Sequence, residues 1–186
     1  GLLWFGWFGF NAGSALAANA LAVVAFINTH LASAAAMLAW IMLDAANGKK
    51  PSALGACIGA VVGLVAITPA AGYVDYGPAV FIGFIASVIS NYAVHWKSKS
   101  DIDDTLDVFP CHGLGGIVGM ILTAVFAKNG GLITGSTTLF MYHLLGLGIV
   151  LVFTFGGAWL LLKVTHLISP LRVLPGHEWM GLDMGQ

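Results

Sequence analysis

Residues 138–168 carry the sequence TLFMYHLLGLGIVLVFTFGGAWLLLKVTHLI, in which Lys163 is the only lysine, arginine, aspartate or glutamate. A helix needs about 20 mainly apolar residues to cross the hydrocarbon core of a bilayer. This run exceeds that length and stays apolar along it. It is therefore predicted to form one long transmembrane helix.

The composition of the whole chain agrees with a membrane environment. Hydrophobic residues make up 59% of the 186 residues, charged residues make up 8%, and the mean hydropathy is +0.92. Soluble domains carry about 25% charged residues. We therefore predict an all-α fold, a polytopic membrane helix bundle in the lipid bilayer. The net charge of -1 provides no basic face, so we expect no nucleic-acid partner.

Five further apolar stretches precede this helix, separated by polar residues, glycine or proline. Their approximate bounds are 1–16, 20–43, 53–67, 79–96 and 108–126. The first stretch begins without a charged flank, which indicates a partial helix of a truncated or split polypeptide. The other four stretches and the helix at 138–168 are expected to be five full spans. We expect residues 1–169 to form the transmembrane domain and residues 170–186 to begin a cytosolic C-terminal tail.

Basic residues gather on one side of the expected bundle. When successive loops are placed on alternate sides, six of the seven Lys and Arg residues fall on or near one side: Lys49, Lys50, Lys97, Lys99, Lys163 and Arg172. Only Lys128 falls on the other. By the positive-inside rule, the side rich in Lys and Arg is cytoplasmic. The sequence thus predicts a multi-pass protein of the cell membrane with a cytoplasmic C-terminus and Ser14 toward the outer face.

Small residues recur at four-residue spacing in two of the expected helices. The clearest examples are Gly55, Gly59 and Gly63, and a second dense group is Gly113, Gly115, Gly116 and Gly119. Such spacing lets helix backbones approach closely in lipid, where no hydrophobic force drives helices together. These glycines are expected to serve helix packing.

The first stretch contains the motif Gly6-Trp7-Phe8-Gly9-Phe10-Asn11-Ala12-Gly13-Ser14. Phe10 and Ser14 are four residues apart, so a helix places the ring and the hydroxyl on one face. A ring face attracts a cation by about 0.5 to 2 kcal/mol, and a hydroxyl oxygen can accept a hydrogen bond from it. The pair is a candidate vestibule for a small ammonium-like cation.

His112 is the second candidate, because ionisable groups at membrane depth usually face a cavity or a partner. A neutral histidine bonded to a neighbouring helix is the structural alternative. His112 follows an acidic cluster composed of Asp101, Asp103, Asp104 and Asp107. Carboxylates at this place are expected to cap the free amides of the next helix and to complement its positive end.

Segment 103–107 also has the D-D-x-x-D form that binds magnesium diphosphate in some prenyl-transferring enzymes. An intramembrane diphosphate-dependent prenyltransferase would want a second acidic cluster and several Arg or Lys residues for the phosphates. The sequence offers neither. We therefore expect no enzyme, no cofactor and no metal ligand, and the prenyltransferase stays a distant alternative.

Several motifs, taken in chain order, are similar to those of the Amt/Rh ammonium transporter family, specifically its Amt branch. They are WFGFNAGS (7–14), NT (28–29), PSALGAC (51–57), ITPAAGY (67–73), DVF (107–109), HG (112–113), LRV (171–173) and GLD (181–183). The resemblance implies an eleven-helix, homotrimeric transporter built from two inverted repeats. This chain resembles its second half, from about the sixth helix to the start of the cytosolic tail.

The resemblance also implies roles for individual residues. Phe10 matches one of two stacked gate phenylalanines, and Ser14 matches the hydroxyl of the outer ammonium site. His112 matches the second of two paired pore histidines. Leu3 and Val108 match apolar pore-lining positions. Asp107 matches a structural carboxylate near the inner end of the pore. The remaining pore residues belong to the family's first five helices, so we expect that an N-terminal half is required to complete the pore. A PII-type regulator is a candidate partner at the cytosolic face.

Physical arguments favour a mechanism of this kind. A bare ion in an apolar pore carries an idealised penalty of order 20 kcal/mol. Removing the proton of a lysine-like ammonium at pH 7 costs about 5 kcal/mol. We therefore expect ammonium to be selected near Phe10 and Ser14, to give up its proton, and to pass His112 as ammonia. An ammonium-binding sensor module that signals without turnover is the alternative function.

Overall fold

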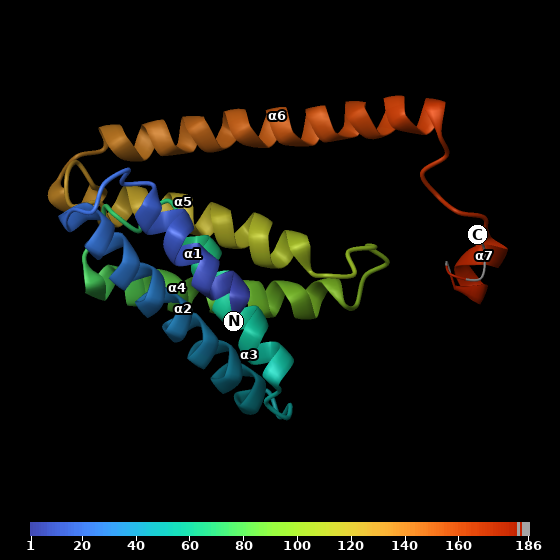
Figure 1. Cartoon of the computed structure of the whole chain (residues 1–186), viewed down its shortest axis with the longest axis horizontal. Helices are drawn as coiled ribbons and strands as arrows, with labels where there is room; N and C mark the ends of the chain where they lie inside the picture. Colours follow the sequence, from blue (N-terminus) through green and yellow to red (C-terminus); the bar gives the residue numbers. More distant parts are fainter. Residues whose placement is uncertain (182, 184–186) are drawn as a thin grey trace. The chain divides into compact units, whose positions relative to one another are not determined.

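The computed structural model describes residues 1–181 and 183, and no strand occurs among them. The elements follow one another as helices and short loops, which confirms the all-α class (Figure 1). In chain order they are α1 (Leu2–Gly13), α2 (Ala20–Ala46), α3 (Ala53–Ile67), α4 (Tyr76–Lys97), the π-helical turn η1 (Phe109–Gly113), α5 (Leu114–Phe126), the 3₁₀ turn η2 (Leu132–Thr134), α6 (Thr138–Ile168) and α7 (Pro175–Met180).

Four helical segments of the described chain are long and apolar enough to cross a membrane. They are Ala20–Ala46, Tyr76–Lys97, Phe109–Phe126 and Thr138–Ile168. Helix α3 has the expected bounds but only 15 residues, which rise roughly 22 Å. It is therefore shorter than the full span that we predicted. The Ser52 hydroxyl caps its start by accepting a hydrogen bond from the Gly55 amide, and Thr68-Pro69 follows its end.

The chain divides into two compact units, one covering Gly1–Leu144 and one beginning at Leu145. In the first unit, helices α1 to α5 pack side by side (Figure 1). Helix α2 contacts α1, α3 and α4, and α3 also contacts α1, α5 and η1. The second unit holds the rest of α6 and the short helix α7. The tail helix α7 was not anticipated from the sequence.

Close backbone contacts confirm the packing role of several glycines. A Cβ atom at Gly63 would lie 2.5 Å from the carbonyl oxygen of Ala32, on α2. A Cβ atom at Gly119, on α5, would lie 2.2 Å from the carbonyl oxygen of Ala66, on α3. Only glycine lets these helix backbones come so near. By contrast, a Cβ atom at Gly116 would have nothing within 4 Å.

Replacing Gly119 with alanine is expected to destabilise the protein by about 1 to 3 kcal/mol, the usual cost of overpacking. The added methyl would meet a backbone carbonyl that can move only with its helix. Thermal unfolding of the purified full-length protein in detergent measures the effect. Gly116→Ala, three residues earlier on the same helix, should leave the midpoint unchanged, and equal midpoints for the two variants would contradict the explanation.

Polar side chains bind the helices together inside the first unit. The Ser33 hydroxyl on α2 donates to the Ala60 carbonyl on α3 over 2.9 Å, and the Ser87 hydroxyl on α4 donates to the Ala36 carbonyl on α2 over 2.7 Å. The Asn28 amide donates to the carbonyls of Ala71 and Val74, at 2.8 and 2.9 Å. Asn28 thereby fixes the non-helical segment between α3 and α4. This segment forms one wall of the site described next.

Candidate functional site

Phe10 and Ser14 line one hollow of about 200 Å³ in the first unit. Their four-residue spacing on α1 and its C-terminal turn places both on one face, as predicted from the sequence. The opposite wall comes from α2 and from the segment after α3. The complete lining is Phe10, Asn11, Ser14, Ala15, Leu21, Ala25, Thr68, Ala71, Gly72 and Tyr73. We call this space the Phe10–Ser14 hollow.

The Ser14 hydroxyl is oriented by its own helix. Its Oγ atom donates to the Phe10 carbonyl over 2.7 Å. Because the hydroxyl proton is engaged, the oxygen lone pairs are left to accept a hydrogen bond. Phe10 is 62% exposed, and its ring makes a T-shaped contact with the Trp7 ring at a centroid distance of 5.7 Å. The hollow therefore offers an acceptor oxygen and a ring, the two groups that an ammonium-like cation needs.

Two hydrogen bonds anchor α1 behind Phe10. Trp7 Nε1 donates to Thr68 Oγ1 at the end of α3, over 2.9 Å. Asn11 Nδ2 donates to the buried Thr29 Oγ1 on α2, over 3.0 Å. Trp7 and Asn11 are also four residues apart, so one stripe of α1 faces the bundle. The sequence analysis missed these positioning roles, although the spacing of the two polar side chains was a visible signal.

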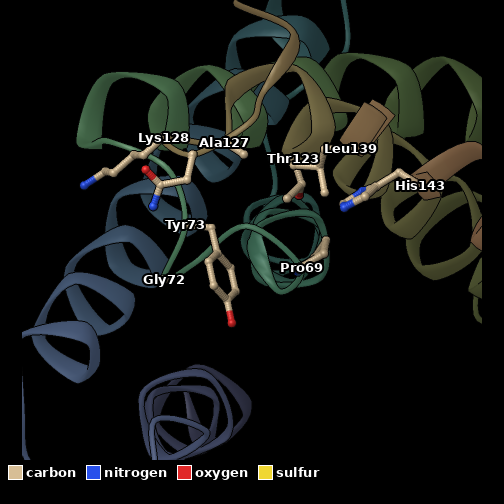
Figure 2. A pocket seen from close by; sticks show the side chains of 9 residues that line it. Pro69, Gly72, Tyr73, Thr123, Ala127, Lys128, Leu139 and His143 are labelled. Atoms are coloured by element: carbon tan, nitrogen blue, oxygen red, sulfur yellow. The ribbon is translucent and has the colours of Figure 1, made fainter. Parts of the chain in front are cut away.

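Figure 2 shows a second hollow, of about 330 Å³. Gly72 and Tyr73 line both this hollow and the first one. His143 on α6 borders it, and the Nδ1 atom of this ring is 2.9 Å from the Met120 carbonyl. The Lys128 ammonium on its rim pairs with Asp75 at 2.8 Å. A hollow bordered by a lysine suits a cation less well than the Phe10–Ser14 hollow does.

His112 lies in the π-helical turn η1, at the start of the segment that continues as α5. Its side chain is exposed, and none of the hydrogen bonds found among the described residues involves its ring. Pro110 contributes to the wide turn because it has no amide hydrogen for the helix ladder. The Leu114 amide closes the turn on the Phe109 carbonyl. Such single π turns often occur at functional sites.

The predicted apolar pore residues are largely exposed. Leu3 lies seven residues before Phe10, hence on the same face of α1, and is 63% exposed. Val108 precedes η1 and is 51% exposed. Helix α3 contacts both α1 and η1. Leu3 on α1 and Val108 next to η1 thus belong to two parts of the chain that both pack against α3.

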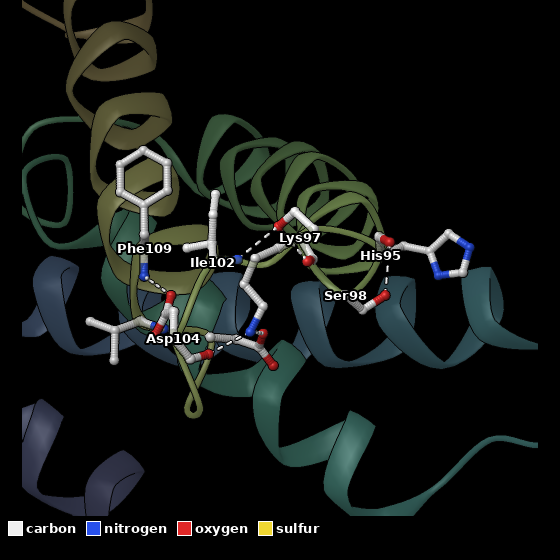
Figure 3. A network of polar contacts seen from close by, with 9 residues as sticks. His95, Lys97, Ser98, Ile102, Asp104 and Phe109 are labelled. Carbon is white, nitrogen blue, oxygen red and sulfur yellow. Dashed lines mark hydrogen bonds and ion pairs between the residues drawn. The ribbon is translucent and has the colours of Figure 1, made fainter. Parts of the chain in front are cut away.

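Of the four residues in the acidic cluster, Asp104 caps the start of η1 in the way predicted (Figure 3). One carboxylate oxygen of Asp104 accepts from the Val108 amide over 2.8 Å, and the other accepts from the Phe109 amide over 2.9 Å. These donated hydrogen bonds, that of Phe109 first, lower the pKa of Asp104 below its usual value. Asp107 pairs with Lys97 at 2.5 Å. No group of three or more metal-ligating side chains occurs in the described part of the chain.

The sequence model of the Ammonium Transporter Family matches residues 1–186. The chain belongs to the ammonium transporter family. With the four long apolar helical segments found among its described residues, it is a multi-pass membrane protein of this family.

Individual members of the ammonium transporter family are similar in sequence and in structure. The ammonium transporter of Bacillus subtilis is 41% identical over 191 residues, covering 98% of this chain and 47% of that protein. The crystal structure of Saccharomyces cerevisiae Mep2 matches with a TM-score of 0.88 at 37% identity, covering 94% of this chain and 42% of that one. A structure named a sensor Amt protein gives 0.89 at 31% identity, covering 99% and 46%. The chain spans about half the length of the curated relatives that it matches.

Proposed function

We propose that this chain forms the second half of an ammonium transport pore. The observation that carries the proposal is the Phe10–Ser14 hollow, where a ring and an acceptor oxygen line the same small space. Such a site suits ammonium because the cation has four hydrogen atoms to donate and a positive charge for the ring face. Membership of a family whose named members are ammonium transporters supports the same substrate.

In the proposed pathway, ammonium is recruited at Phe10 and Ser14 on the outer side and gives up its proton there. Neutral ammonia then passes the apolar side chains of Leu3 and Val108 and the imidazole of His112. A neutral imidazole can donate with one ring nitrogen and accept with the other, which fits ammonia better than an alkali ion. Asp107 has a structural role at the inner end. The chain acts as a transporter rather than an enzyme.

The proposal includes the cellular setting. Residues 1–169 form the transmembrane domain of a cell-membrane protein, and residues 170–186 begin a cytosolic tail. The Lys and Arg residues support this orientation, since Lys128 alone falls on the outer side. We further propose a homotrimer in which an N-terminal half supplies the rest of each pore. A PII-type regulator is the candidate partner at the cytosolic face.

Uptake of radiolabelled methylammonium tests the transport function. Proteoliposomes containing the full-length protein are expected to accumulate the label with saturable kinetics, because the Phe10–Ser14 hollow holds one cation at a time. Ammonium should compete, and potassium, which has no hydrogen atom to donate to Ser14, should not. Protein-free liposomes are the control. Uptake that rises linearly with concentration and ignores competing ammonium would contradict the proposal.

An ammonium sensor is the second candidate function, favoured by the similarity to the structure named a sensor Amt protein. A sensor uses the same hollow to bind ammonium but does not move it across the bilayer. Equilibrium binding of methylammonium to the purified protein, measured beside uptake, separates the two functions. Saturable binding without accumulation would favour the sensor.

A further inference from the structure

Lys97, in the last turn of α4, holds the loop that leads to His112. Its Nζ atom pairs with Asp107 Oδ1 at 2.5 Å and also donates to the backbone carbonyl of Asp104 (Figure 3). The two side chains of the ion pair are 15% and 21% exposed. One ammonium group therefore ties the loop to α4 at two points.

The residues held by Lys97 are those that shape the start of η1. The Asp104 carboxylate caps the amides of Val108 and Phe109, and the Asp107 carbonyl accepts from the Cys111 amide over 3.0 Å. Asp104 is thus bound to Lys97 through its carbonyl and to η1 through its carboxylate. The π-helical turn that carries His112 therefore begins at hydrogen bonds made by Asp104 and Asp107.

Asp107 has an uncommon backbone conformation, with a φ of 53°. Non-glycine residues adopt this left-handed region rarely, and they persist there when the surrounding contacts fix them. The ion pair to Lys97 is such a contact. The direction in which the chain enters η1 depends on this residue, so releasing its side chain would let the entry angle relax.

A second contact from α4 reaches the same turn. The buried Ser90 hydroxyl donates to the Pro110 carbonyl over 2.8 Å. Ser90 lies two helical turns before Lys97. Helix α4 therefore contacts this region twice, through buried Ser90 at Pro110 and through Lys97 at the loop before η1. His112 follows both attachments, two residues after Pro110, so its backbone continues directly from residues that α4 holds.

We propose that Lys97 is a positioning residue for His112, acting through Asp107 and Asp104 to fix the π-helical turn. The proposal deepens the transport function proposed above and rests on it. Lys97 does not contact the substrate. Its removal misplaces the imidazole along the pore while leaving the Phe10–Ser14 hollow, which belongs to other elements, in place.

Methylammonium uptake by Lys97→Met in the full-length protein tests the proposal. The maximal rate should fall by about tenfold or more, since small misplacements of a working group can cost up to about 100-fold. The half-saturation concentration should stay unchanged, because selection occurs elsewhere. Lys97→Arg, which keeps a cation for Asp107, should retain most of the rate. Lys99→Met is the matched control, since Lys99 is an exposed lysine two residues later, just after the end of α4, and should behave as the wild type.

The outcomes separate a positioning role from general stabilisation. A wild-type rate in folded Lys97→Met, or an equal loss in Lys97→Arg, would overturn the proposal. If Lys97→Met does not fold, Lys97→Gln replaces it in the test, because glutamine keeps a hydrogen-bond donor for Asp107. Lys97→Gln is expected to lower the maximal rate and to leave the half-saturation concentration unchanged. An unchanged maximal rate in Lys97→Gln would also overturn the proposal. If uptake by the wild-type protein rises linearly with concentration and ignores competing ammonium, the proposed function itself fails. If wild-type uptake is saturable and Lys97→Met leaves it unchanged, the function stands and this inference falls.

Discussion

Replacing His112 with alanine in the full-length protein is expected to stop ammonium conduction or to let potassium compete. Ammonia inside an apolar pore needs a hydrogen-bond partner, and an unpaired polar group in such surroundings costs about 1 to 3 kcal/mol. If that cost adds to the barrier, uptake falls by about 5- to 150-fold. A variant that still conducts would do so through a site without the imidazole, and its preference for ammonium over potassium should fall. Methylammonium uptake with and without potassium measures both results.

Two further variants make the test specific to the imidazole at this position. His112→Gln keeps one donor and one acceptor in a side chain of similar length, so it should conduct better than the alanine variant. His95→Ala removes an exposed imidazole near the end of α4, which contacts Lys49 at 3.1 Å, and should transport as the wild type. Unchanged rate and selectivity in His112→Ala would remove His112 from the mechanism.

Local sequence signals were enough to place most helices. The bounds of α3 follow from the Ser52 cap and from Thr68-Pro69, and both signals act within a few residues of the helix ends. The tail helix α7 also has local signals, since Pro175 begins it and Gly181 follows it. The bounds of α7 were therefore predictable from the sequence as well.

The candidate site was only partly predictable. The shared face of Phe10 and Ser14 follows from helical spacing alone. The contact of Trp7 with Thr68 joins residues 61 positions apart, and no local pattern specifies which distant hydroxyl an indole will meet. The same holds for Asn28, whose two carbonyl partners lie more than 40 residues away. These contacts depend on how the helices pack.

The π-helical turn at His112 is a further case where packing decides. The sequence predicts a span of about residues 108–126, and the structure has a helical segment from Phe109 to Phe126. This segment begins with a wide turn, which follows a positive φ at Asp107 and contains Pro110, a residue without an amide hydrogen. Two side chains of α4 hold this region: Lys97 pairs with Asp107, and the Ser90 hydroxyl donates to the Pro110 carbonyl. The geometry at this candidate pore residue therefore depends on a helix that carries no candidate itself.

Replacing Ser14 with alanine is expected to weaken ammonium recruitment more than it slows conduction. The Ser14 oxygen is the acceptor that the Phe10–Ser14 hollow provides in a fixed orientation. A hydrogen bond to a charged group contributes about 1.5 to 3 kcal/mol, so its loss should raise the half-saturation concentration by about 10- to 150-fold. The maximal rate at saturating methylammonium should change little, because His112 and the apolar pore side chains remain. Concentration-dependent uptake by the full-length protein measures both quantities.

A conservative variant decides whether ammonium recruitment needs the Ser14 hydroxyl oxygen or only the space that the side chain fills. Ser14→Thr keeps the hydroxyl, and threonine can also donate to the carbonyl four residues earlier, so its half-saturation concentration should stay near that of the wild type. Ser136→Ala removes a hydroxyl that does not line the hollow and should have no effect. If Ser14→Ala instead lowers the maximal rate at an unchanged half-saturation concentration, the hydroxyl acts during conduction. Recruitment would then have to rest on the Phe10 ring alone, which attracts a cation by only about 0.5 to 2 kcal/mol.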